Sequence, residues 1–222
     1  MYKQGNYKKI IGFTLAEVLI TLTIIGIVAA LTIPAIIQKV QDTQYKVAFK
    51  AAFSDIAAAT QEIMLNNGGT MKGICTDGDH TCFRNAYQPF FNSIKSCDND
   101  ASFGVCWPEH HRALVGEGAE ETYNVSSIVL NNGIALRFCF NNRDCVHPSN
   151  TILRCGWVAI DVNGLKNPNR FGKDIFYVHI QENKISPWGA PGDQANRICI
   201  AGDISSSNGW GCAAKVLKNE NY

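Results

Sequence analysis

One apolar run near the N-terminus limits what this chain can fold into more than any other feature. Residues 13–37 read FTLAEVLITLTIIGIVAALTIPAII and contain one ionisable group, Glu17. A helix of about 20 apolar residues crosses the hydrocarbon core of a bilayer, whereas a secretory signal has a shorter apolar region that ends in a small-residue cleavage site. The run therefore predicts a membrane-spanning helix rather than a removable secretory signal.

Charge and cysteine placement predict the same orientation for this helix. Lys8 and Lys9 lie a few residues before the run, and the bias of basic residues toward the cytoplasm places the short N-terminus there. All the cysteines lie between Cys75 and Cys212, on the other side of the run, where an oxidising compartment permits disulfides. We therefore expect a single-pass protein of the inner (cytoplasmic) membrane with a periplasmic or extracellular C-terminal part.

The helix is predicted to continue beyond the membrane through residues 38–66. Apolar residues recur there at spacings of three and four, which is typical of a helix with one buried face. Asn66, Asn67, Gly68 and Gly69 predict its end, because Gly and Asn tolerate the left-handed conformation that terminates helices. Pro34 removes one backbone hydrogen bond inside the helix and favours a kink.

The sequence after residue 66 predicts a small antiparallel sheet, and the fold class is therefore α+β. Residues 70–121 are predicted to be an irregular, disulfide-stapled region. The triplet Asn131-Asn132-Gly133 predicts a hairpin between two strands. The expected strands cover residues 123–130, 134–140, 157–162 and 175–181. We expect this sheet to pack on the apolar face of the helix and to form a globular head of residues 67–222.

Nine cysteines indicate a stapled head. They are Cys75, Cys82, Cys97, Cys106, Cys139, Cys145, Cys155, Cys199 and Cys212. Because the number is odd, at least one thiol is expected to be free, buried or paired between chains, and the pairing does not follow from the sequence. A zinc site of Cys139, Cys145, His147 and Cys155 is the alternative, but these residues lack the close C-x(2–4)-C spacing of structural zinc sites.

The residues at the start of the apolar run resemble a known processing signal. The stretch Gly12-Phe13-Thr14-Leu15-Ala16-Glu17, followed by an apolar helix, resembles the class III signal of type IV prepilins and type II secretion pseudopilins. The resemblance implies that a membrane peptidase removes residues 1–12 as a cytoplasmic leader by cutting the Gly12–Phe13 bond, and then methylates Phe13. Glu17 and Pro34 match the glutamate and the helix proline of that family.

Glu17 admits two interpretations. A carboxylate inside a membrane helix costs about 2.5–3.5 kcal/mol on insertion scales and normally needs a partner. The resemblance implies that this partner is the new ammonium of Phe13 on a neighbouring subunit, which makes Glu17 an assembly residue. Alternatively, Glu17 lies close enough to the cytoplasmic edge of the membrane to reach water. The surrounding motif favours the assembly role.

A second, weaker resemblance concerns residues 161–174, which are similar to a strand-loop-strand segment of many pseudopilins and minor pilins. The oxygen-rich side chains of this loop suit calcium, and we expect Asp161, Asn163 and Asp174 to be its ligands. The loop is not an EF-hand, because Gly172 stands at the twelfth position, where that motif has Glu. The alternative is a turn in which Asn, Asp and Gly satisfy their own backbone.

The functional prediction is a structural subunit, not an enzyme, of a type IV pilus or a type II secretion pseudopilus. The irregular 70–121 insertion favours a minor subunit. The implied partners are other pilin or pseudopilin subunits, the prepilin peptidase and methyltransferase, the inner-membrane assembly platform and the lipid bilayer.

The alternative to a structural subunit is a filament-tip or membrane-anchored binding module for adhesion, a secreted substrate or DNA uptake. With 20 basic and 19 acidic residues, the chain is not expected to bind nucleic acid by bulk charge. An acid–base pair of Glu120 and Glu121 is discounted, because adjacent residues of a strand point to opposite sides. The four tryptophans are expected in the core.

Overall fold

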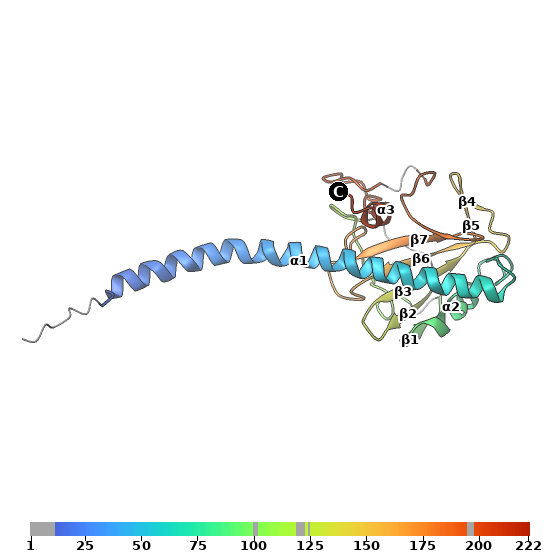
Figure 1. The fold of residues 1–222 in the computed structure, drawn as a ribbon, viewed down its shortest axis with the longest axis horizontal. Helices are drawn as coiled ribbons and strands as arrows, with labels where there is room; N and C mark the ends of the chain where they lie inside the picture. The colour runs from blue at the N-terminus through green and yellow to red at the C-terminus, as the bar shows by residue number, and fades with distance from the viewer. Residues whose placement is uncertain (1–11, 100–101, 119–122, 124, 195–197) are drawn as a thin grey trace, which may run out of the picture. The chain divides into compact units, whose positions relative to one another are not determined.

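The computed structural model describes residues 12–99, 102–118, 123, 125–194 and 198–222. The chain divides into two compact units, Met1–Gln41 and Asp42–Tyr222. Helix α1 (Leu15–Asn66) begins in the first unit and continues into the second (Figure 1). The predicted leader and the Glu120–Glu121 pair lie, apart from Gly12, outside the described residues.

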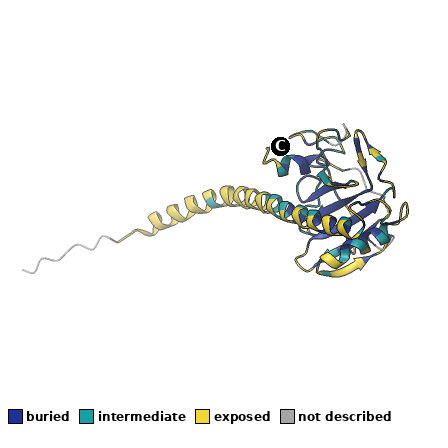
Figure 2. Ribbon diagram, turned by 45° about the vertical axis from the view of Figure 1, so that its right-hand side comes forward, coloured by how far each residue is buried: buried dark blue, intermediate teal, exposed yellow. Residues whose placement is uncertain are grey.

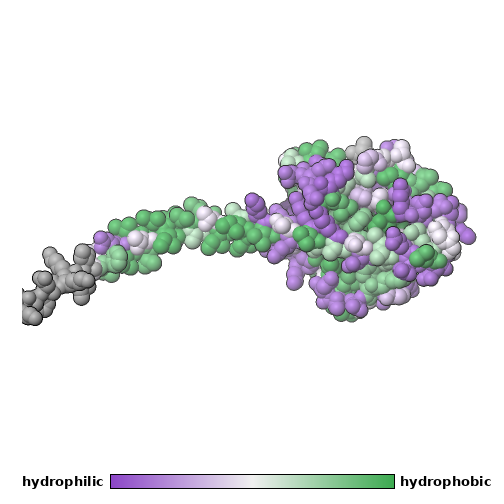
Figure 3. All heavy atoms as spheres, in the orientation of Figure 1, coloured by the Kyte–Doolittle hydropathy of each residue, from purple (hydrophilic) through white to green (hydrophobic). Residues whose placement is uncertain are grey.

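In the first unit, residues 18–37 of α1 contain no charged side chain and are apolar around most of the helix circumference. By length and composition, this helix can cross a membrane, and none of its most apolar stretch is buried. Hydrophobic residues cover the visible side of this part of α1 in Figure 3. A helix that is apolar all round requires lipid or other helices as its surroundings, because water is an unfavourable solvent for such a surface. Pro34 lies within α1, and the helix continues past it.

In the second unit, α1 is amphipathic, as predicted. Its buried residues recur every three or four positions: Phe49, Ala52, Ile56, Ala59, Thr60 and Ile63. The ring of Phe49 stacks on Phe176 of the sheet with 4.3 Å between the centroids. The helix ends at Asn66, and Gly68 and Gly69 follow with φ values of 70° and 90°. These glycines confirm the predicted termination signal.

An antiparallel sheet of six strands packs on α1 and confirms the α+β fold (Figure 1). Its spatial order is β1-β2-β3-β6-β7-β8. The strands are β1 (Ser93–Cys97), β2 (Ser126–Leu130), β3 (Ala135–Phe140), β6 (Gly156–Asp161), β7 (Ile175–Ile180) and β8 (Ile185–Pro187). A separate ribbon joins β4 (His147–Ser149) and β5 (Ile152–Arg154). Strands β2 and β3 form the predicted hairpin, with Val129 opposite Ala135 and Gly133 at a φ of 88°.

Both faces of the central sheet are buried (Figure 2). Every residue of β3, β6 and β7 is buried. One face packs on α1, and the other packs on an aromatic layer contributed largely by loops. In that layer Tyr177 stacks on Trp188 at 4.4 Å, and Trp107 and Trp157 are buried. Tryptophans are therefore core residues, as predicted, but the second layer was not predicted.

The prediction of an irregular, disulfide-stapled region at 70–121 was confirmed for the disulfides, Cys75–Cys82 and Cys97–Cys106, and wrong for the irregular structure. The region contains helix α2 (His80–Tyr87), a 3-10 turn (Gln88–Phe90) and the edge strand β1. The side chain of Asp79 caps α2 by accepting a hydrogen bond from the backbone N–H of Cys82 at 2.8 Å. Phe83 and Tyr87, four positions apart, turn toward the core, where the Tyr87 hydroxyl contacts Thr60 Oγ1 at 2.7 Å. A short C-terminal helix, α3 (Cys212–Leu217), completes the second unit.

Candidate functional site

The bond between Gly12 and Phe13 lies in an exposed segment without regular secondary structure, directly before α1. Phe13 is 90% exposed, and α1 begins two residues later at Leu15. No heavy atom lies within 4 Å of the position that a Cβ atom would take at Gly12. Nothing in the described chain therefore obstructs an enzyme that grips this backbone.

Glu17 and Thr14 cap the start of α1. Glu17 Oε2 accepts hydrogen bonds from the Thr14 backbone N–H at 2.8 Å and from the Thr14 hydroxyl at 2.9 Å. In return, the backbone N–H of Glu17 donates to Thr14 Oγ1 at 3.2 Å. This reciprocal arrangement is a capping box, and its T-x-x-E spacing was visible in the sequence. The sequence prediction missed this role, which occupies one of the two carboxylate oxygens of Glu17.

The 161–174 loop holds two buried carboxylates between β6 and β7. Asp161 ends β6 and Asp174 precedes β7, and both are 0% exposed. Asp174 accepts hydrogen bonds from the backbone N–H groups of Asn169 and Arg170 at 2.8 and 2.6 Å. Burial, and secondly the charge of Asp174, raise the pKa of Asp161 well above its usual range. Burial also raises the pKa of Asp174.

Three side-chain oxygens of this loop are buried and accept no hydrogen bond: Asp161 Oδ2, Asn163 Oδ1 and Asn169 Oδ1. Asp161 Oδ1 accepts from the backbone N–H of Asn163 at 3.1 Å, which is the local turn that the alternative interpretation expected. That turn leaves the other oxygens without a donor, although a buried acceptor without a partner is unfavourable. Carboxylate and amide oxygens are ligands that hard cations prefer, so the donor set fits calcium. Asn169 was missing from the predicted ligands.

The loop also touches α1. The Asn163 side-chain amide donates to the hydroxyl of Tyr45 at 3.3 Å and to the carbonyl oxygen of Asn167 at 3.1 Å. Lys173 of the same loop pairs with Asp42 of α1 at 3.2 Å. The loop therefore holds α1 against the sheet at the start of the second unit.

Eight of the nine cysteines form disulfides within the chain. The bridges are Cys75–Cys82, Cys97–Cys106, Cys145–Cys155 and Cys199–Cys212. Cys139 is in none of them and lies buried in β3. The Cys145–Cys155 disulfide contains two of the three cysteines that the alternative zinc site would need as ligands. Among the described residues, no group of three or more His, Cys, Asp or Glu side chains is arranged to hold a metal ion.

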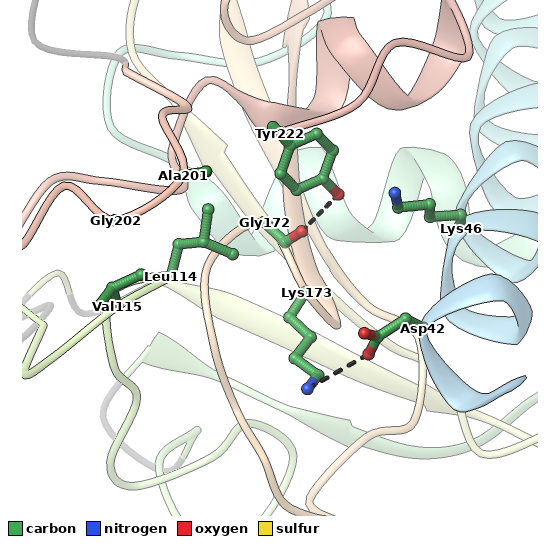
Figure 4. A pocket seen from close by; sticks show the side chains of 9 residues that line it. All are labelled: Asp42, Lys46, Leu114, Val115, Gly172, Lys173, Ala201, Gly202 and Tyr222. Carbon is green, nitrogen blue, oxygen red and sulfur yellow. Dashed lines mark hydrogen bonds and ion pairs between the residues drawn. The ribbon is translucent and has the colours of Figure 1, made fainter. Parts of the chain in front are cut away.

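Two hollows lie along α1 within the second unit. One has a volume of about 290 Å³ and contains the Lys173–Asp42 ion pair and the hydrogen bond from the Tyr222 hydroxyl to the Gly172 carbonyl, both drawn in Figure 4. It is lined by Asp42, Lys46, Leu114, Val115, Gly172, Lys173, Ala201, Gly202 and Tyr222. The other has a volume of about 400 Å³ and is lined by Asp55, Ala58, Ala59, Glu62, Phe90, Phe91, Asn92, Leu130, Asn131 and Asn132.

Comparison with known families identifies the N-terminal signal. Residues 7–33 match the prokaryotic N-terminal methylation motif, which is the class III prepilin signal of type IV pilins and pseudopilins. The motif supports a processed subunit of the type IV pilin or pseudopilin kind, and it implies processing by prepilin peptidase and assembly with other pilins. No curated protein and no solved structure matches the chain.

Proposed function

We propose that this chain is a minor subunit of a type IV pilus or a type II secretion pseudopilus. Prepilin peptidase cuts it between Gly12 and Phe13 and methylates Phe13, and residues 13–37 hold it in the inner membrane until it assembles. The observation that supports this function best is the methylation motif at residues 7–33, placed directly at the start of an apolar α1.

In this proposal, the two parts of the chain have separate tasks. The apolar helix inserts into the membrane and later packs with the helices of other subunits, with Glu17 and Pro34 in the roles of the family's glutamate and proline. The assembly platform of the inner membrane supplies the neighbouring subunits. The second unit, with both sheet faces buried and four disulfides, supports a stable head that the filament displays outside the cytoplasm.

Replacing Gly12 tests the processing step. Gly12→Leu should leave an uncut precursor in the membrane, because a side chain at the scissile bond obstructs an enzyme that grips the backbone closely. Gly26→Leu is the matched control, since Gly26 lies within α1 and also has no heavy atom within 4 Å of its Cβ position. Mass spectrometry of the N-terminus measures both cutting and methylation. Normal cutting of Gly12→Leu would contradict the proposed site.

We also propose that the 161–174 loop binds calcium through the predicted ligands Asp161, Asn163 and Asp174 together with Asn169. The three buried oxygens without hydrogen-bond donors favour this second function. A divalent cation would neutralise the two buried carboxylates, whose raised pKa values reflect the cost of keeping them charged without one. Because Asn163 contacts Tyr45, the cation would also support the attachment of α1 to the sheet.

A further inference from the structure

The second unit begins close to the predicted membrane run. The run ends at Ile37 and the second unit begins at Asp42, five positions later. Five residues span at most about 18 Å even when fully extended. Whatever the relative arrangement of the two units, the chain therefore holds the Asp42 end of the second unit within that distance of the end of the membrane run.

Three segments that are distant in the sequence line the same hollow as Asp42. They are residues 114–115, 172–173 and 201–202, and the hollow has a volume of about 290 Å³ (Figure 4). Residues 201–202 belong to the loop that the Cys199–Cys212 disulfide closes, which we call the 199–212 loop. This loop is therefore part of the end of the second unit that lies nearest to the membrane run along the chain.

The 199–212 loop exposes two isoleucines. Ile204 is 79% exposed, the highest value among the large hydrophobic side chains described in the second unit, and Ile200 is 51% exposed. The carbonyl oxygen of Ile204 lies 3.9 Å from the position that a Cβ atom would take at Gly116, so the loop adjoins the segment that contains the half-buried Leu114 and Val115. Single exposed apolar side chains are common, but here four lie on two adjoining segments, which indicates an interaction surface.

Internal contacts hold the 199–212 loop in this exposed conformation. The side-chain amide of the buried Asn208 donates to the carbonyl oxygens of Ile200 and Asp203 at 2.9 and 2.6 Å. Its Oδ1 atom accepts a hydrogen bond from the backbone N–H of Ile200 at 3.1 Å. The backbone N–H of Leu114 donates to the carbonyl oxygen of Asn208 at 2.8 Å, and the disulfide joins the two ends. The loop is therefore ordered in advance, and little conformational entropy is lost when it binds a partner.

The charges around the two isoleucines are partly paired and leave an excess of positive charge. Two ion pairs lie there, Lys173–Asp42 at 3.2 Å and Arg112–Glu117 at 3.6 Å. The described side chains outside these pairs include two positive groups and one negative group, namely Lys46, Arg170 and Asp203. Apolar side chains beside positive charge favour the surface of a bilayer that contains anionic phospholipid.

We propose that, while the chain is anchored in the inner membrane, the 199–212 loop contacts the surface of the bilayer. Ile200 and Ile204 lie in the interfacial region between the headgroups and the acyl chains. This inference rests on the membrane anchor of the proposed function and adds a second lipid contact that the anchor itself does not require. Because the anchor makes the contact intramolecular, a weak affinity is sufficient. The contact orients the head of the membrane-bound subunit, and it must break when the subunit leaves the bilayer for a filament.

A photoreactive residue in the loop tests the contact in the full-length chain. The chain carries p-benzoylphenylalanine in place of Ile204 and is reconstituted in vesicles of phosphatidylcholine and phosphatidylglycerol. Leu65 is the matched control position, because it is 71% exposed and lies 23 positions from Asp42, which is about 35 Å of helix. Irradiation should attach lipid at the position of Ile204 at least about fivefold more often than at the position of Leu65.

The role of the isoleucines is tested with the photoreactive residue in place of Ala201, which is exposed between them. Ile200→Asp/Ile204→Asp should reduce lipid attachment there about fivefold or more, because charged carboxylates are unfavourable in the bilayer interface. Both isoleucines are exposed, so the melting temperature of the head should stay unchanged, which separates loss of the contact from misfolding. Ile94→Asp/Leu153→Asp is the matched control, since these side chains are 71% and 51% exposed, and it should leave lipid attachment unchanged.

Equal lipid attachment at the positions of Ile204 and Leu65 would overturn the inference. Unchanged attachment in Ile200→Asp/Ile204→Asp, or attachment of the photoreactive residue to protein instead of lipid, would also overturn it. Extraction of the wild-type chain from the vesicles by alkaline carbonate would instead contradict the membrane anchor, and with it the proposed function.

Discussion

Glu17 has two candidate partners, and they use different properties of the same side chain. The capping box needs an acceptor that reaches the Thr14 backbone N–H and hydroxyl, which one oxygen already does. The proposed contact with the Phe13 ammonium of a neighbouring subunit needs the negative charge. A glutamine can form the box but carries no charge. The two roles can therefore be separated by substitution.

Glu17→Gln and Glu17→Leu should both be cut at Gly12, because loss of a carboxylate favours insertion into the bilayer. If the charge is the assembly contact, both should enter filaments poorly. Only Glu17→Leu should also fray at the start of α1, where loss of a cap costs about 0.5–2 kcal/mol. Amide hydrogen exchange at residues 14–18 measures the fraying, and sheared filaments measure assembly. Thr14→Val, which weakens the cap but keeps the charge, should assemble. Wild-type assembly of Glu17→Gln would assign Glu17 to the cap alone.

Local signals predicted the elements that they encode directly. Apolar residues at helical spacing, such as Phe49, Ile56 and Ile63, predicted the second part of α1, and the glycines after Asn66 predicted its end. The Asn131-Asn132-Gly133 turn predicted the β2–β3 hairpin. Helix α2 was also readable, from Asp79 as its cap and from Phe83 and Tyr87 on one face, but the surrounding turn residues obscured it.

Other elements depend on contacts between distant parts of the chain. Strand β1 is a short, mainly polar segment that pairs with β2, and its sequence gives no strand signal of its own. The aromatic layer brings Trp107, Trp188 and Phe171 together on the outer face of the sheet from separate loops. In the 161–174 loop, the sequence predicted Asp161, Asn163 and Asp174 as calcium ligands. Asn169 was not predicted, because only the tertiary structure shows that its Oδ1 atom is buried without a hydrogen-bond donor.

The 161–174 loop should make the stability of the metal-free head depend on pH. Burial raises the pKa of Asp161 and Asp174, so the folded head binds protons more tightly than the unfolded chain. Stability is therefore lost as pH rises from about 4, the value of an unfolded Asp, through the raised pKa values. Calcium should recover this loss by neutralising the loop. Asp161→Asn should raise the melting temperature without calcium at neutral pH and should reduce the calcium-dependent increase.

Asp193→Asn is the control for that experiment. Burial on its own would raise the pKa of Asp193, but its contacts with His179 and Ser149 lower it below its usual range. Those contacts are 3.1 and 2.6 Å long and stabilise the head above pH of about 4. Asp193→Asn should therefore lower the melting temperature with or without calcium. If calcium does not shift the melting of the wild-type chain, the loop is a turn and not a cation site.

The two units of the chain rely on different sources of stability. The apolar helix of the first unit needs lipid or neighbouring helices, whereas the second unit has two buried clusters and every cysteine. Its disulfides are local, because the paired cysteines are 7 to 13 positions apart. Each such bridge restricts a short loop of the unfolded chain and contributes ~2–3 kcal/mol on the chain-entropy account. The bridges therefore stabilise loops, while the sheet and α1 form the core.

Because only the second unit contains disulfides, we expect their reduction to destabilise the head without preventing cleavage after Gly12. Mass spectrometry of the membrane-extracted protein without reductant should find the four local bridges, with Cys139 alkylated only after denaturation because it is buried. Reduction should lower the melting temperature of the head, whereas cutting at Gly12 should continue, since the first unit contains no cysteine. Cys139→Ala is the control and should keep all four bridges. Alkylation of seven or more thiols in the native, unreduced protein would show that the cysteines of the head are not paired in disulfides. They would then again be candidate metal ligands.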